Sequence, residues 1–294
     1  MAELLQGKPV SDEIARNIES RVAALHELGV CPTLALVRVG DRPDDVAYER
    51  AVIKQAEALG VRTHQVTLAA GAAEDQVVRF IKAINADVDI HGCLLFRPLP
   101  PHLDEERVCN ALAATKDVDG ITSASLARVF IGSGLGFPPS TADACLKVLD
   151  YYGVPLEGAR VVVVGRSLVV GRPLAMMLLA RHATVTLCHS RTSDVAAVTR
   201  EADVAVFASG RPKHFGAEYV RPGQVIVDVG INFDAAGVMC GDVDDAAVEP
   251  IVRAITPVPG GVGTVTTAMT LLHTVEAAEV AAREQMDIAI ERLM

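Results

Sequence analysis

Short apolar runs and helical segments alternate along the first half of the chain. Residues 33–39 (TLALVRV) and 90–96 are apolar runs that predict buried strands, and residues 62–68 have a strand-like pattern. Between these runs, apolar residues recur every three or four positions, which predicts helices over residues 10–28, 44–59, 74–85 and about 105–114. Strands separated by helices of this length indicate a parallel sheet with right-handed crossovers.

The alternation restarts after a segment rich in Gly, Pro and Ser, residues 132–141, which predicts a domain boundary. Beyond it the pattern predicts a helix over residues 173–180, a final helix over 266–284, and strands at 161–164, 184–188, 204–208 and 225–229. We therefore predict an α/β fold with two lobes. Residues 1–140 form a parallel α/β lobe, completed by a C-terminal helix (267–294) that packs back on it, and residues 141–266 form a Rossmann-like lobe.

Composition and charge narrow the class of protein. Half of the 294 residues are hydrophobic and 22% are charged, which excludes a disordered chain. The net charge of −10 and the absence of a basic run argue against nucleic-acid binding. The six cysteines lack CxxC spacing and are expected to be buried thiols of a reducing compartment, with no metal site. Without a signal peptide or a membrane-spanning run, we expect a cytoplasmic protein.

The segment VVVVGRSLVVGRP, residues 161–173, predicts a strand, a turn at Gly165 and a helix that begins near Gly171. Glycine at such a turn lets the backbone approach a pyrophosphate, and the helix N-terminus offers N–H groups to it. The spacing G-x-S-x-x-x-G only approximates the usual G-x-G-x-x-G. A dinucleotide-binding loop is therefore the favoured interpretation, and a plain strand–turn–helix is the alternative.

The end of the next strand distinguishes between the two nicotinamide cofactors. An NAD site places an acidic residue there to bind the ribose hydroxyls. Here the chain continues as Cys188-His189-Ser190-Arg191-Thr192 and reaches no carboxylate before Asp194. Ser190 can bind a 2′-phosphate by a hydrogen bond, and Arg191 can pair with it through two N–H groups. We predict NADP as the cofactor; the alternative is that Arg191 is simply a solvated loop residue.

Over nearly its whole length the chain resembles the FolD family, the methylenetetrahydrofolate dehydrogenase/methenyltetrahydrofolate cyclohydrolases. The matching segments are GRSLVVGRP (165–173), ATVTLCHSRT (183–192), VDVGIN (227–232), GDVD (241–244), TPVPGGVG (256–263), KDVDG (116–120) and PLP (98–100). The resemblance implies a catalytic domain over 1–140, an NADP-binding domain over 141–266, and a homodimer. It implies an NADP site formed by Gly165, Arg166, Ser167, Ser190, Arg191 and Ile231.

By the same resemblance, Tyr48 and Asp119 position the substrate, a folate. The ring of Tyr48 would pack on a substrate ring, and Asp119 would accept two hydrogen bonds from a pterin edge. From the residues alone, Tyr48 could equally be a half-buried helix residue and Asp119 a turn-capping residue. The full set of expected substrate-binding residues is Tyr48, Val52, Leu95, Phe96, Arg97, Asp119, Pro259, Gly260, Gly261, Val262 and Gly263.

The chain departs from the family pattern within the substrate-binding set. Val52 stands where bifunctional members carry a Lys, and Phe96 stands where they carry a Gln. Lys54 is about 200° further around a helix from Val52, so we do not expect it to substitute. Arg97 replaces a usually apolar residue, and Asp45 a common Ser.

These departures separate the two reactions of the family. Oxidation of 5,10-methylenetetrahydrofolate transfers a hydride and no proton, so positioning suffices. Cyclohydrolysis must activate water and move protons, which a Lys with a lowered pKa can do. We therefore predict an NADP-dependent dehydrogenase with weak or absent cyclohydrolase activity. The alternatives are an NADPH-dependent reductase of a non-folate imine or iminium, and a catalytically silent folate-binding protein.

Overall fold

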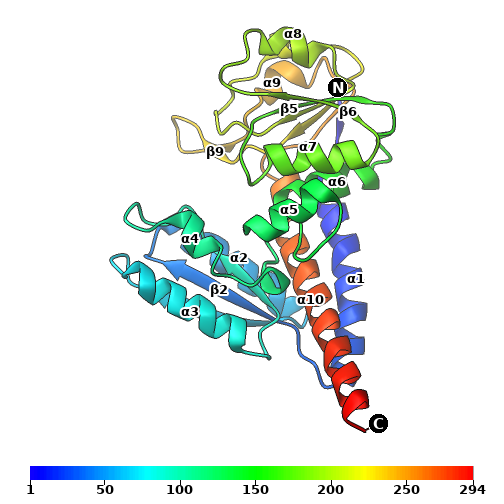
Figure 1. Cartoon of the computed structure of the whole chain (residues 1–294). Helices are drawn as coiled ribbons and strands as arrows, with labels where there is room; N and C mark the ends of the chain where they lie inside the picture. The colour runs from blue at the N-terminus through cyan, green and yellow to red at the C-terminus, as the bar shows by residue number, and fades with distance from the viewer. Residues whose placement is uncertain (294) are drawn as a thin grey trace. The chain divides into compact units, whose positions relative to one another are not determined.

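The computed structural model describes residues 1–293 and divides them into two compact units (Figure 1). We call residues 1–12, 129–132 and 141–266 the six-stranded unit. Residues 13–128, 133–140 and the chain from 267 onward form the three-stranded unit. The first twelve residues, which the sequence had placed in the N-terminal lobe, cluster instead with the six-stranded unit. The reason is that β1 (Glu3–Leu4) pairs with β11 (Ala254–Ile255).

The six-stranded unit contains one parallel sheet with the order β1-β11-β8-β7-β5-β6. The other strands are β5 (Arg160–Val164), β6 (Thr184–Cys188), β7 (Val204–Phe207) and β8 (Val225–Asp228). Helices α6 (Ser140–Tyr151), α7 (Gly171–Ala180), α8 (Val195–Arg200) and α9 (Asp245–Val248) connect them, with the 3-10 turn η2 (Ala217–Tyr219). An antiparallel hairpin of β9 (Asn232–Phe233) and β10 (Met239–Cys240) follows β8.

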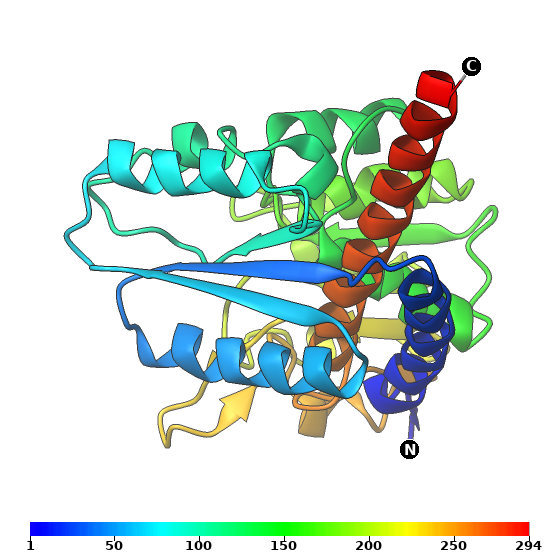
Figure 2. The same ribbon diagram turned by 90° about the horizontal axis from the view of Figure 1, so that it is seen from below.

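The three-stranded unit has a parallel sheet in the order β3-β2-β4, formed by Arg62–Leu68, Thr33–Val39 and Gly92–Leu95. Figure 2 shows α2 (Pro43–Ala58) and α3 (Glu74–Ala86) on opposite faces of this sheet. The remaining elements are α4 (Glu105–Cys109), η1 (Ala114–Lys116) and α5 (Ser123–Ile131), with most of α1 (Gly7–Glu27) and α10 (Val262–Leu293).

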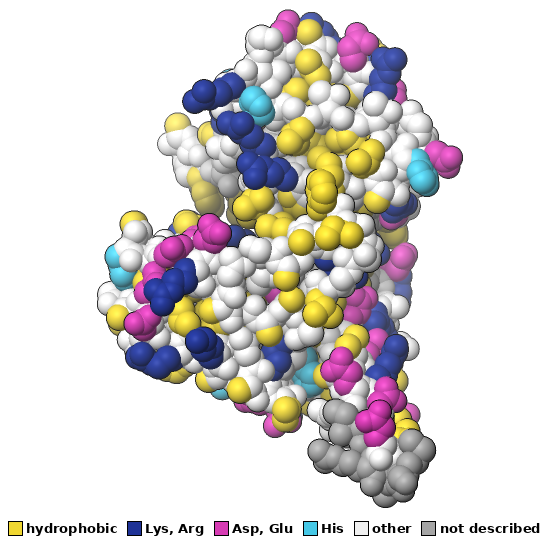
Figure 3. Space-filling view, in the orientation of Figure 1, with side chains coloured by type: hydrophobic (Ala, Val, Ile, Leu, Met, Phe, Trp, Pro, Cys, Tyr) yellow, Lys and Arg dark blue, Asp and Glu magenta, His cyan; other side chains and the backbone are white. Residues whose placement is uncertain are grey.

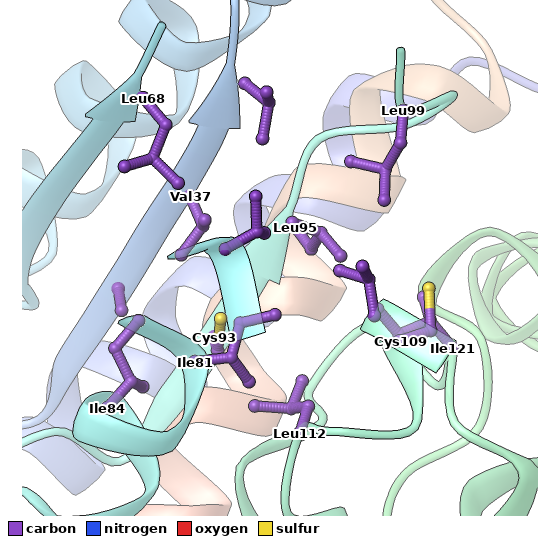
Figure 4. Close-up of a cluster of buried hydrophobic side chains, with 14 of the residues drawn as sticks. Val37, Leu68, Ile81, Ile84, Cys93, Leu95, Leu99, Cys109, Leu112 and Ile121 are labelled. Atoms are coloured by element: carbon purple, nitrogen blue, oxygen red, sulfur yellow. The ribbon is translucent and has the colours of Figure 1, made fainter. Parts of the chain in front are cut away.

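The alternation of side chains along β2 builds two layers of core. Val37 and its neighbours on one face pack with Ile81 and Ile84 of α3, in the apolar cluster drawn in Figure 4. Because successive strand residues point to opposite faces, Leu36 and Arg38 belong to the other face. Arg38 is only 9% exposed and pairs with a carboxylate of α2, that of Glu49. A buried ion pair thus lies within an otherwise apolar sheet–helix interface.

The Arg38–Glu49 pair has a well-defined geometry. The Arg38 Nε atom donates to Glu49 Oε2 at 3.2 Å, and Nη1 donates to the carbonyl of Gly40. Glu49 Oε1 is a buried polar atom without a hydrogen-bond partner among the described residues. The pair therefore depends on Arg38 for compensation of the Glu49 charge.

We expect Arg38→Met to lower the free energy of unfolding by about 3–5 kcal/mol, because it leaves a buried carboxylate unpaired. Adding Glu49→Leu should recover most of that loss, since both charges are then replaced by apolar groups. Urea unfolding followed by circular dichroism would measure both variants. An Arg38→Met protein that unfolds at the wild-type urea concentration would contradict this account of the pair.

The fold class predicted from the sequence is confirmed. Within the three-stranded unit α10 packs against the rest of the unit through Arg21–Glu279 ion pairing and the hydrogen bond from Thr270 Oγ1 to Ser140 Oγ. The helix expected over about 105–114 begins at Glu105 as predicted but is shorter, because α4 ends at Cys109. Asn85 Nδ2 donates to the carbonyl of Ala111, and Asn85 Oδ1 accepts from the N–H of Ala113. These bonds occupy backbone groups that a continued helix would need.

The cysteines form no disulfide in the described structure. All six cysteines are free thiols, buried except for Cys31, which is partly exposed. None of the helices within residues 1–293 combines the length and apolar character that crossing a bilayer requires. The same residues contain no group of three or more potential metal ligands.

Candidate functional site

A cavity of about 500 Å³ lies in the six-stranded unit, where the chain leaves three adjacent strands. It is lined by residues 164–167 at the end of β5, by 189–190 and 192–196 after β6, by 208, 209 and 211 after β7, and by 214, 215 and 219. In the sheet β5 lies between β6 and β7. The connection that follows β5 therefore leads to one side of it, and the connection that follows β6 leads back to the other side. Such a switch point at the carboxyl ends of parallel strands is where open α/β sheets bind ligands.

The turn between β5 and α7 is shaped by two glycines. Gly165 has a φ angle of +137°, and a Cβ atom there would collide with the carbonyl oxygen of Ala208. A Cβ atom at Gly171 would collide with the carbonyl oxygen of Gly165. Ser167 Oγ accepts from the N–H of Val170, and α7 has no side-chain cap of its own. The first turn of α7 therefore starts beside the cavity with its dipole suited to an anion.

Basic side chains surround this cavity. Arg166 and Arg211 line it, and Figure 3 shows a row of basic side chains across this unit. Ser190 also lines it, while Arg191 is exposed on the same turn but outside the lining. Among the residues that line the cavity, Asp194 is the one carboxylate, and its oxygen accepts from the Ala197 N–H at 2.9 Å to cap α8. The cavity thus fits an NADP phosphate better than bare ribose hydroxyls.

Two buried carboxylates organise the loops next to the cavity. Asp242 accepts from the N–H groups of Ser209, Gly210 and Arg211 and from Asn232 Nδ2. Asp228 accepts from the N–H groups of Gly230, Asp242 and Val243.

Burial raises the pKa of Asp228 to about 7, although those three N–H groups oppose the shift. A Cβ atom at Gly230 would strike Asp242, and one at Gly241 would strike Asp228. The VDVGIN and GDVD segments are therefore hydrogen-bonded to each other and packed closely together. We call this pair of segments the Asp228–Asp242 support.

The loop over residues 256–263 also belongs to the six-stranded unit. Gly260 has a φ angle of +102°, which favours glycine, and Gly261 is buried against the carbonyl of Pro257. Pro259 and Gly263 are exposed, whereas Val262 is buried. Ile231 lies against Gly263, at 3.4 Å from where a Cβ atom would stand. The structure thus brings Ile231 to this loop rather than to the lining of the cavity.

The three-stranded unit brings together a second group of predicted residues. The rings of Tyr48 and Phe96 meet edge to face, with centroids 5.8 Å apart. Burial raises the pKa of Tyr48 to about 12, and the Asp119 carboxylate adds to that shift. Burial likewise raises the pKa of Asp119 to about 6, against an opposing effect of the Arg97 guanidinium. Tyr48, Phe96, Arg97 and Asp119 therefore form one cluster, with a neutral phenol beside a carboxyl group.

Two ion pairs hold the corner after β4, and each includes a residue that we expected to depart from the family pattern, Asp45 or Arg97. Arg42 clamps Asp45 through two hydrogen bonds, of 2.8 and 2.6 Å, and also donates to the carbonyl of Arg97. Arg97 in turn lies 3.6 Å from Glu105, whose other oxygen accepts from the Leu99 N–H. Asp45 is thus committed to Arg42.

Three of the expected substrate-binding side chains are enclosed. Val52 is 0% exposed, and Leu95 and Phe96 are also buried. Lys54 is exposed two residues beyond Val52 on α2. At the position of the expected Lys, the structure therefore has a buried apolar side chain, and Lys54 of the same helix is exposed to solvent.

Sequence reasoning missed several residues around these sites. Arg211 and His214 line the first cavity, and the segment GRPKHF that follows the third predicted strand of that lobe was the available signal. The Asp228–Asp242 support and the Arg38–Glu49 pair join segments that are distant in the chain or on different elements, so no local pattern announces them.

Comparisons with known proteins cover both units. Residues 139–282 match the family described as tetrahydrofolate dehydrogenase/cyclohydrolase, NAD(P)-binding domain, and residues 5–119 match its catalytic domain. The bifunctional protein FolD of Carboxydothermus hydrogenoformans is 49% identical over 95% of this chain and 98% of the relative.

Two solved structures are similar to this chain over nearly its whole length. That of bifunctional FolD from Campylobacter jejuni is 35% identical with a TM-score of 0.92, over 95% of this chain and 99% of that one. That of Trypanosoma brucei FolD, complexed with NADP cofactor and an inhibitor, is 32% identical with a TM-score of 0.91, over 96% and 99%.

Proposed function

The chain belongs to the tetrahydrofolate dehydrogenase/cyclohydrolase (FolD) family, and from this premise we propose that it retains only the first of the two activities. It oxidises 5,10-methylenetetrahydrofolate to 5,10-methenyltetrahydrofolate with NADP and does little to accelerate hydrolysis of the product. The observation that carries this proposal is the complete burial of Val52 at the position of the expected Lys.

The residues of the chain support the oxidation by positioning. NADP, when bound, supplies the acceptor for the hydride. Gly165, Arg166, Ser167, Ser190 and Arg191 would hold its phosphates and ribose, while Asp228 and Asp242 fix the neighbouring loops. Tyr48 offers a ring to the folate, and Asp119 offers acceptor oxygens to its pterin edge. The exposed Pro259 and Gly263, with no bulky polar group, allow close approach of substrate.

Hydrolysis of the methenyl product would need a group that takes or gives a proton. The pKa of about 12 keeps Tyr48 protonated at neutral pH. Val52 and Phe96 carry no titratable group, Asp45 is bound by Arg42, and Asp119 is assigned to binding. With Asp119 engaged by the substrate, these residues would leave no free acid or base to act on water.

A second candidate function draws on Arg97. The Arg97 guanidinium opposes the rise in the pKa of Asp119. At the position of Arg97 the family usually has an apolar residue. A changed charge at this point would suit an NADPH-dependent reductase of a different imine or iminium substrate. Failure of tetrahydrofolate compounds to bind would favour this second function.

A paired assay on the purified protein tests the proposal. One arm follows NADP-dependent oxidation of 5,10-methylenetetrahydrofolate, and the other follows loss of 5,10-methenyltetrahydrofolate absorbance against its spontaneous rate. We expect oxidation without accelerated hydrolysis. Fast enzymatic hydrolysis would refute the loss of cyclohydrolase activity, and absence of oxidation would refute the folate assignment.

We also propose a homodimer, on the family resemblance, and a cytoplasmic location. The net charge of −10 argues against a nucleic-acid partner. Sedimentation of the purified protein would test the dimer.

A further inference from the structure

A second cavity, of about 520 Å³, lies in the three-stranded unit. Its walls come from the C-terminal end of α3, the 134–137 loop and the second half of α10. His91, on its wall, precedes β4, whereas Phe96 and Arg97 follow the other end of that strand. The cavity is thus at the opposite edge of the sheet from these residues, and its volume is typical of small-molecule sites.

Most of the wall is apolar. Val88, Leu135, Phe137, Ala277 and Val280 contribute to it, and Phe137 is held in place by stacking on His273 with ring centroids 5.1 Å apart. Figure 3 shows hydrophobic, basic, acidic and histidine surface side by side in this region of the unit. Such a lining suits an aromatic or aliphatic body with one polar end.

His91 presents an unused hydrogen-bond donor to this cavity. The side chain is 6% exposed, and its Nδ1 accepts from the Thr33 N–H at 3.2 Å, which places the ring proton on Nε2. Burial lowers the pKa of His91, and Lys116 lowers it further, so the ring stays neutral at pH 7. Nε2 forms no hydrogen bond among the described residues, and the ring lines the cavity, so this N–H is available to a ligand there.

Lys116 adds a positive charge beside this donor. Its Nζ donates to the carbonyls of Ile84, at 2.7 Å, and Asp87, which leaves one of its three N–H groups. Arg128, on another side, donates to the carbonyl of Gly136. Of the two acidic residues on the wall, Glu276 is paired with Arg21 at 3.3 Å and Glu284 is exposed. The polar end of the cavity therefore favours an anion.

We propose that this cavity binds a small carboxylate with an aromatic or aliphatic body. One carboxylate oxygen accepts from His91 Nε2 and the other from Lys116 Nζ, while the body packs against Phe137 and the apolar face of α10. The proposal does not depend on the folate reaction, because it concerns a separate cavity.

Calorimetric titration of the full chain with 2-naphthoate tests this site. We expect saturable binding at one site, at least tenfold weaker in His91→Phe and unchanged in the matched control His64→Phe, which alters an exposed histidine of β3. The alcohol 2-naphthalenemethanol and the amine 2-naphthylmethylamine should bind at least tenfold more weakly than 2-naphthoate. Tighter binding of the amine, or no binding of 2-naphthoate, would overturn the proposal.

A second variant guards against a folding defect in His91→Phe, which leaves the Thr33 N–H without its acceptor. Ala281→Phe fills the cavity from α10 and leaves His91 intact, so it should abolish 2-naphthoate binding while the melting temperature stays within a few degrees. Saturating NADP should leave the binding unchanged. Displacement by NADP, or full binding to Ala281→Phe, would place 2-naphthoate elsewhere and overturn the assignment.

Discussion

The double variant Val52→Lys with Phe96→Gln is expected to hydrolyse 5,10-methenyltetrahydrofolate about 10²–10⁴ times faster than the wild-type chain, the usual contribution of a positioned general acid or base. Val52 is completely buried one helical turn after Tyr48, so an ammonium introduced there leaves water. Desolvation lowers the pKa of such a Lys toward neutrality, where it can exchange protons with water near the substrate.

The matched control for this variant is Val52→Met with Phe96→Gln, which has similar bulk and no amine. Dehydrogenase activity should change little in either protein, since the hydride step needs no proton transfer. The rate of hydrolysis should rise with pH until the new amine is deprotonated. An equal gain in the Met control would show that access of water, and not the amine, limits the wild-type protein.

Asp119→Ala is expected to lower kcat/KM for 5,10-methylenetetrahydrofolate by about 10²–10⁴. A hydrogen bond to a charged group contributes about 1.5–3 kcal/mol, and two such bonds to the pterin edge would be lost. Asp119→Asn keeps one acceptor and should lose less. Steady-state kinetics at saturating NADP measures both, and NADP binding should be unchanged. Wild-type kinetics in Asp119→Ala would remove this residue from the substrate site.

The same carboxyl group predicts a pH profile. Burial raises the pKa of Asp119 to about 6, so it is ionised at pH 7 and protonated below pH 6. Since only the carboxylate accepts at both oxygens, kcat/KM should fall as the pH is lowered through about 6. Arg97→Met removes the cation that opposes the rise in the pKa of Asp119, so the fall in kcat/KM should move to higher pH.

The raised pKa of Asp119 also affects folding. Ionisation of Asp119 lowers the free energy of unfolding as the pH rises above the unfolded pKa of 3.8. The variant Asp119→Asn should therefore be more stable than the wild-type protein at pH 7.

The sequence predicted those features of the fold that depend on interactions between residues close together in the chain. The apolar spacing of α2 placed Tyr48 and Val52 one turn apart, and the chain after β6 showed that no free carboxylate follows that strand. The period of side chains along β2 made its burial predictable. Each of these features depends on neighbours within a few residues, and so the sequence carries it directly.

The remaining features depend on contacts between distant segments. The N–H of Asp242 donates to the Asp228 carboxylate across fourteen positions, and the Asp242 carboxylate accepts from the N–H groups of loop 209–211, more than thirty positions away. Arg38 is one residue of an apolar run, and nothing near it indicates the carboxylate of α2. The break after Cys109 depends on Asn85 of α3. Such contacts form only when the fold brings the elements together, which explains why periodicity did not predict them.

The position of α10 in the chain affects when the three-stranded unit can fold during protein synthesis. The three-stranded unit takes its strands from the first third of the sequence, but its contacts at Glu279, His273 and Thr270 come from α10, which is translated after the strands of the six-stranded unit. At about 5–20 residues per second, a ribosome needs roughly 10–30 seconds to pass from residue 140 to residue 293. During that interval the six-stranded unit can complete its sheet, while the apolar surface that α10 will cover stays open and available to chaperones.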